Sequence, residues 1–220
     1  NTMPQLGSND VDHRTPHPDR WGGYFVTTDT PVPYSQRAHA GNITFTSGGN
    51  TSNQVFVDWE SGSPDARGYL ATTSDIVGLL AFDHQMHAIN LITRLNWEAR
   101  VDGGAVPALV NELADYLVFA GEVPPSVPLV ALPGFAGHLE SSTPRDRRGR
   151  SCGQLDLDKR LLRYPCSYMV YADAFDGLPA AVRQAVYRRM IETLSRTATA
   201  ADRTAVLEIL RDTKPEFPQP

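Results

Sequence analysis

The clearest pattern of apolar and polar positions runs through residues 73–100. Helical spacing of about 100° per residue places one set of side chains along a single stripe: Ile76, Leu80, His84, His87, Leu91 and Arg94. A second stripe carries Leu79, Phe82, Met86, Ile89, Thr93 and Trp97. Apolar residues on both stripes predict a central helix that other elements cover from two sides. We expect Thr73 or Ser74 to cap its start, and Gly103 and Gly104 to follow its end.

Other stretches show weaker patterns of the same kinds. Two alternating segments, 42–46 and 54–59, are separated by Gly48, Gly49 and Asn50 and predict a β-hairpin. Helical spacing covers residues 106–121, 178–196 and 200–211, and the leucine spacing predicts that a further helix begins near Asp156. Pro107 lies in the first turn of the first of these helices, and we expect Thr199 to cap the one at 200–211. The residues of the first helix that are expected to face inward are Leu109, Leu113, Tyr116, Leu117 and Ala120. Residues 122–144 contain five prolines and are expected to form a long irregular connection.

These patterns predict a mainly α (α+β) fold, in which a small N-terminal β-hairpin element precedes a helical core. We divide the chain into an extended proline-rich arm at 1–22, a small β element at 23–70, a helical domain at 71–214 and a tail at 215–220.

Composition narrows the class of protein. The 220 residues are 41% hydrophobic and 20% charged, which is ordinary for a globular domain. The net charge of −5 argues against a generic binder of nucleic acid or anionic membranes. No run approaches the roughly 18 to 20 apolar residues that a transmembrane helix requires.

The start of the chain and its two cysteines bear on where the protein works. The sequence opens at Asn1 without a basic and apolar leader, so we expect either a removed leader or the later part of a longer precursor. Export fits, which predicts a periplasmic or extracellular location. In such an oxidising compartment Cys152 and Cys166 could form one disulfide, and two reduced, buried thiols are the equally weighted alternative.

Histidines are the main candidates for chemistry. His84 and His87 lie three residues apart on one predicted helix, so both imidazoles could face one metal ion or haem. Their spacing differs from the i, i+4 pair of zinc proteases, and no glutamate follows the first histidine. The alternative is a pair of core histidines satisfied by polar neighbours.

His39 lies in a loop of small residues that would let a large group approach, or is a solvent-exposed loop histidine. His138 is a weaker candidate for a ligand in a loop.

Several catalytic signatures are missing from the sequence. It has no G-x-S-x-G, no glycine-rich phosphate loop, no C-x-x-C and no C-x-x-C-H for attaching c-type haem. An arginine-rich stretch includes Arg148 and Arg150, which could contact a carboxylate, a haem propionate or an acidic partner. The alternative is a solvated loop.

Three groups of segments carry a resemblance to a known family. The first comprises residues 12–16 (DHRTP), 20–23 (RWGG) and 39–42 (HAGN); the second comprises 74–77 (SDIV), 84–87 (HQMH) and 98–100 (EAR). The third comprises 149–151 (GRS), 156–157, 160–161, 163–168 (RYPCSY), 175–179 (FDGLP) and 210–214 (LRDTK). Together they resemble the C-terminal portion of a largely uncharacterised family of exported bacterial proteins known as cytochrome c-like.

The resemblance implies electron transfer or haem-based redox chemistry outside the cytoplasm, with a redox partner or a c-type cytochrome chain. In that family a haem-attaching C-x-x-C-H lies upstream of the D-H-R-x-P segment. A longer precursor or another chain would therefore supply the haem. His39, His84 and His87 become positions to test as haem ligands, with Arg148 and Arg150 near the propionates. The alternatives are a non-catalytic binding or assembly module of an exported complex and, more weakly, a metal-dependent hydrolase that uses His84 and His87.

Overall fold

The part of the chain described by the computed structural model is helical. It covers residues 11–16, 75–101, 107–125, 128–131 and 134–220. Its helices are α1 (Ile76–Val101), α2 (Pro107–Leu117), α3 (Phe135–Ser141), the 3-10 helix η3 (Tyr168–Tyr171), α4 (Asp173–Asp176), α5 (Ala180–Thr197) and α6 (Ala200–Thr213). Within these ranges the only β pairing is an isolated antiparallel bridge between Leu155 and Leu162. The mainly α prediction is confirmed for this part, whereas the predicted hairpin and the 23–70 element lie outside it.

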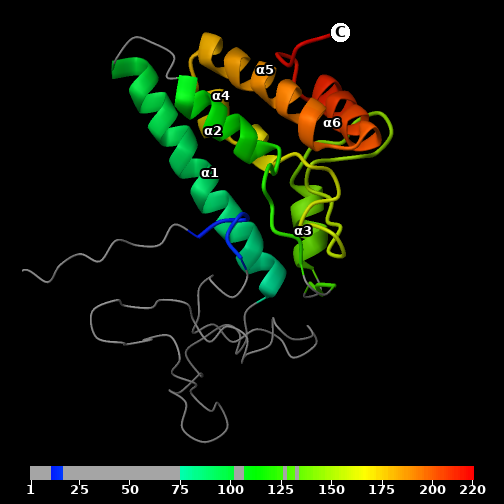
Figure 1. Cartoon of the computed structure of the whole chain (residues 1–220). Helices are drawn as coiled ribbons and strands as arrows, with labels where there is room; N and C mark the ends of the chain where they lie inside the picture. The colour runs from blue at the N-terminus through cyan, green and yellow to red at the C-terminus, as the bar shows by residue number, and fades with distance from the viewer. Residues whose placement is uncertain (1–10, 17–74, 102–106, 126–127, 132–133) are drawn as a thin grey trace, which may run out of the picture.

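The core forms where α2 packs between α1 and α5 (Figure 1). Leu113, Tyr116 and Leu117 of α2 are fully buried, as are Val186 and Met190 of α5. These side chains recur at three- and four-residue spacing, so each helix turns one apolar face toward the other. The α2 residues are those that the sequence pattern predicted to face inward.

The longest helix, α1, lies on one side of the molecule and is covered along one face. Leu80, His84 and Leu91 of the first predicted stripe are buried. On the second stripe, by contrast, 56% of Phe82 and 70% of Trp97 are exposed. Among the described elements, α2, η3 and α4 pack against α1 and bury one of its faces. Within this part of the chain, the prediction of a central helix covered from two sides is therefore wrong.

Helix starts follow local hydrogen bonding. An oxygen of Asp75 accepts from the Val77 N–H at 2.9 Å, so Asp75 caps α1, whereas the predicted caps Thr73 and Ser74 lie outside the described residues. Pro107 occupies the first position of α2, as predicted. The Thr199 side chain accepts from the Asp202 N–H and caps α6, which is also as predicted.

Two predictions for the middle of the chain are wrong. The connection at 122–144 contains helix α3, which the chain enters through Gly134 at a φ of 99°, a conformation that favours glycine. The predicted helix near Asp156 is instead a tight loop. There Leu157 has a φ of 67°, and the Asp156 carboxylate accepts from two backbone N–H groups that follow it. Such side-chain bonds compete with helix formation.

The end of the chain is packed rather than free. Phe217, inside the stretch predicted as a tail, is 1% exposed, and its ring centroid lies 5.0 Å from that of Tyr187 on α5. None of the helices in the described ranges combines the length and apolarity needed to cross a membrane.

Candidate functional site

Buried histidines from distant parts of the chain meet beside α1. We call His13, His84, His87, Asp12 and Ser167 the histidine cluster; all five residues are buried. The His13 and His84 Nδ1 atoms are 2.9 Å apart, and His84 Nε2 lies 2.6 Å from Ser167 Oγ. Because two imidazole nitrogens share the first bond, one ring donates and the other accepts. Both ring nitrogens of His84 are thus engaged inside the protein.

Aromatic rings from α2 and the turn after it enclose the cluster. The Tyr116 ring centroid lies 4.2 Å from that of His13, 4.9 Å from that of His84 and 4.6 Å from that of His87. Phe119 stacks on His84 with a centroid separation of 4.4 Å. The Tyr116 hydroxyl donates to the His84 carbonyl oxygen at 3.2 Å, which fixes the ring against α1. The His84 imidazole, which is fully buried among these rings, therefore lies in an environment that favours its neutral form.

Ionic contacts of Arg14, in addition to ring stacking, hold the segment 11–16 in place. Arg14 donates to Asp12 Oδ2 through Nε at 3.0 Å and Nη2 at 2.6 Å, and its Nη2 lies 3.2 Å from His87 Nε2. The guanidinium also lies 5.0 Å from the Tyr116 ring centroid. Burial opposes ionisation of Asp12, but hydrogen bonds and charge from Arg14 outweigh it and lower the pKa of the carboxyl.

The protonation state of His84 follows from this setting. Burial, and then the neighbouring imidazoles of His13 and His87, hold the pKa of His84 well below its ordinary value. A neutral ring with both nitrogens hydrogen-bonded has no nitrogen to offer iron, so His84 does not fit a haem ligand in this arrangement.

Within the described ranges, no three His, Cys, Asp or Glu residues are grouped to hold a metal ion, so the hydrolase alternative gains no third ligand.

The sequence pattern identified only part of this cluster. It placed His84 and His87 on one helix face, as observed, but gave His13 and Asp12 no role. Their partners on α1, His84 and His87, lie more than 70 positions away, and no local spacing encodes such a contact. The available signal was the D-H-R-x-P segment itself, as one of the segments of resemblance. His39 lies outside the described residues.

Arg148 and Arg150 bind other parts of this chain. The Arg148 Nη1 and Arg150 Nη2 atoms donate to Glu208 Oε2 on α6 at 2.8 and 2.6 Å. Arg150 Nε also donates to Asp146 Oδ2 at 2.7 Å. Burial opposes ionisation of Asp146, but bonds from Arg150 and the Arg148 backbone lower its pKa. In this structure the arginines fix a loop to α6, so they do not fit the predicted propionate contacts.

Cys152 and Cys166 are free, buried thiols in this structure, so the disulfide alternative is not formed here. The Tyr171 hydroxyl lies 3.8 Å from Cys152 Sγ and 2.7 Å from Thr213 Oγ1. Contact with Cys152, and then burial, raises the pKa of the Cys166 thiol well above its ordinary value. The Cys166 thiol therefore remains protonated, and both sulfurs belong to the apolar core.

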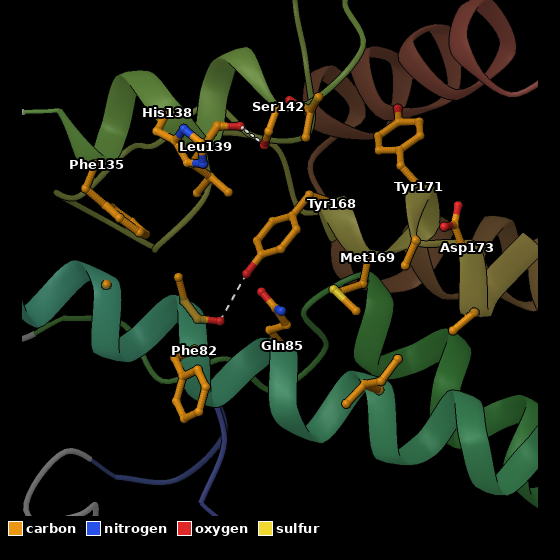
Figure 2. A pocket seen from close by; sticks show the side chains of 16 residues that line it. Phe82, Gln85, Phe135, His138, Leu139, Ser142, Tyr168, Met169, Tyr171 and Asp173 are labelled. Atoms are coloured by element: carbon orange, nitrogen blue, oxygen red, sulfur yellow. Dashed lines mark hydrogen bonds between the residues drawn. The ribbon is translucent and has the colours of Figure 1, made fainter.

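A second candidate site is an open cavity of about 700 Å³ between α1, α3 and the η3–α4 segment (Figure 2). Tyr168 projects across it, and its hydroxyl donates to the Ala81 carbonyl oxygen of α1 at 3.0 Å. Burial raises the pKa of Tyr168, so the hydroxyl remains protonated. His138, which the sequence left as a weak ligand candidate, lies on α3 at this cavity.

Comparison of the chain with models of known families, with curated proteins and with solved structures found no match.

Proposed function

We propose that this chain is an exported subunit or domain of a c-type cytochrome system, with a role in haem-associated electron transfer. One observation carries the proposal. His13, His84 and Ser167 come one from each of the three groups of segments that resemble the cytochrome c-like family, and they form one hydrogen-bonded chain in the core. The three residues lie far apart in the sequence. Their contact in the core gives one structural reason for the presence of all three in the segments of resemblance.

Within this proposal the histidine cluster is a structural anchor. It ties the segment 11–16 to α1 and to Ser167, at the start of η3, through a buried hydrogen-bonded network. Because both His84 nitrogens are engaged, we assign His84 a positioning role. His39, which belongs to the first group of segments of resemblance, remains a candidate for a haem ligand.

The test is an optical spectrum of the protein purified from its native source under conditions that retain its partners. We expect a Soret band, and we expect His39→Ala to change its position or intensity, because loss of an axial imidazole changes the iron ligand field. His138→Ala serves as the matched control, since this exposed histidine lies on α3. A native preparation with no Soret band and no bound iron, and with His39→Ala indistinguishable from wild type, would refute the proposal.

A second candidate function is a non-catalytic binding or assembly module of an exported complex. The observation in its favour is the outer face of α1, which presents four large apolar side chains to solvent: Phe82, Met86, Trp97 and Val101. Exposed apolar residues aligned along one helix are typical of a surface that contacts another protein.

Light scattering on the native preparation distinguishes this function. If α1 contacts a partner, the double substitution Phe82→Ser and Trp97→Ser should lower the mass of the native assembly. Ser195→Ala, at an exposed polar position of α5, should leave that mass unchanged. A wild-type protein that runs as a monomer in its native extract would count against an assembly role.

A further inference from the structure

The cavity of Figure 2 contains two kinds of polar group. Its hydroxyls are engaged within the protein: Tyr168 donates to Ala81, the Ser142 hydroxyl donates to the Leu139 carbonyl oxygen at 2.8 Å, and the Tyr171 hydroxyl bonds Thr213. Their donors are used inside the protein, so these hydroxyls shape the cavity and can offer a ligand only acceptor lone pairs.

Three other polar side chains at the cavity differ from the hydroxyls. Gln85 from α1, His138 from α3 and Asp173 from α4 are exposed at its opening. Among the described residues none of the three side chains has a hydrogen-bond partner. Figure 2 shows Gln85 directed from α1 toward the side of Tyr168. An amide, an imidazole and a carboxylate on three separate elements thus surround one opening.

The interior of the cavity is apolar and aromatic. Phe135 of α3 and the ring of Tyr168 line it, as do the buried side chains of Met169 and Leu139. A volume of about 700 Å³ is within the roughly 300 to 1,000 Å³ range of sites for small ligands. An apolar interior with a few polar groups around the opening is also the usual composition of such sites.

We propose that this cavity binds a small ligand that has a planar aromatic body and a cationic, hydrogen-bond-donating end. The aromatic body would lie against Phe135, Tyr168 and Met169. The cationic end would face the Asp173 carboxylate, with Gln85 accepting a further hydrogen bond. The inference concerns a site separate from the histidine cluster and does not depend on haem.

The experiment uses tryptamine, a planar indole with an ammonium group, and indole-3-propionate, which carries the same ring and a carboxylate. Binding is followed by NMR through the methionine methyl groups of the full chain. Met169 lines the cavity and Met190 is buried in the main core, so the two methyls separate local binding from a global effect. We expect tryptamine to shift the Met169 methyl saturably, to leave that of Met190 unchanged, and to bind more tightly than indole-3-propionate.

Substitutions then test each part of the site. Asp173→Asn should weaken tryptamine binding about two- to fivefold, as expected for an exposed ion pair. Asp158→Asn, which removes an exposed carboxylate outside the cavity, should not weaken it. Phe135→Leu keeps an apolar side chain but removes the ring, and should weaken both indoles about two- to tenfold. No saturable Met169 shift with either indole overturns the site, and equal affinity for the two indoles overturns its preference for a cationic end.

Discussion

The buried imidazole of His84 should make the stability of the protein depend on pH. The ordinary pKa of a histidine is 6.5, and burial together with His13 and His87 holds the folded-state pKa of His84 well below it. Between the two values the unfolded chain binds one more proton than the folded chain. The stabilisation from the neutral ring is therefore complete above about pH 6.5 and is lost as the pH falls toward the folded-state pKa. At pH 5.5 the free energy of unfolding should be about 1.4 kcal/mol lower than at pH 7.5 from this residue alone.

Urea unfolding followed by far-UV circular dichroism measures this difference at the two pH values. His84→Gln removes the titrating group but keeps a side chain that can bond Ser167. Both proteins should lose stability between pH 7.5 and 5.5. The decrease in the free energy of unfolding should be about 1.4 kcal/mol smaller for His84→Gln than for wild type. His138→Gln removes an exposed histidine and should leave the wild-type pH dependence unchanged. Each protein is compared with itself at the two pH values, so a lower absolute stability of His84→Gln does not affect the result.

Carboxylates, and histidines that do not interact with His84, are common to wild type and His84→Gln, so they cancel in this comparison. If His84→Gln loses as much stability between pH 7.5 and 5.5 as wild type does, the imidazole is not held neutral in the folded protein. The account of His84 as a neutral, buried anchor would then be wrong.

Three further predictions concern other contacts. Ser167→Ala removes two buried hydrogen bonds and should lower the free energy of unfolding by about 2 to 4 kcal/mol in urea titrations, whereas Ser195→Ala, at an exposed position, should change it by less than about 0.5 kcal/mol. Cys152 and Cys166 should resist iodoacetamide in the folded protein, and mass spectrometry should find two adducts after unfolding; no adduct after unfolding without reductant would instead indicate a disulfide. Asp115→Asn weakens the hydrogen bonds from α2 to α5 and should lower the midpoint of urea unfolding by an amount equivalent to about 1 kcal/mol.

The sequence by itself determined the long helices and most of their buried faces. The spacing of apolar residues predicted α1, α2, α5 and α6 to within a few residues at each end. Pro107 and Thr199 indicated the starts of α2 and α6, because a proline at the first helical position and a side-chain cap act through neighbouring backbone groups. These are local effects, and adjacent residues are sufficient to specify them.

The spacing of apolar residues did not predict the shorter elements. Helix α3 has only seven residues and follows a proline-rich stretch, so its pattern is too short to separate it from a loop. Near Asp156 the leucine spacing resembled a helix, but side-chain hydrogen bonds from Asp156 formed a loop instead. The leucine spacing favours a helix and the Asp156 side chain favours a turn, and the sequence alone does not show which of the two forms.

Only the tertiary structure decided which face of α1 is covered and what the histidines contact. The two stripes of α1 are similarly apolar, and the difference between them arises because α2 and η3 pack against one and leave Phe82 and Trp97 exposed. His84 bonds His13 and Ser167 from positions 71 and 83 residues away. Such contacts depend on how the elements pack in space, so the spacing of residues along one helix could indicate buried histidines but not their partners.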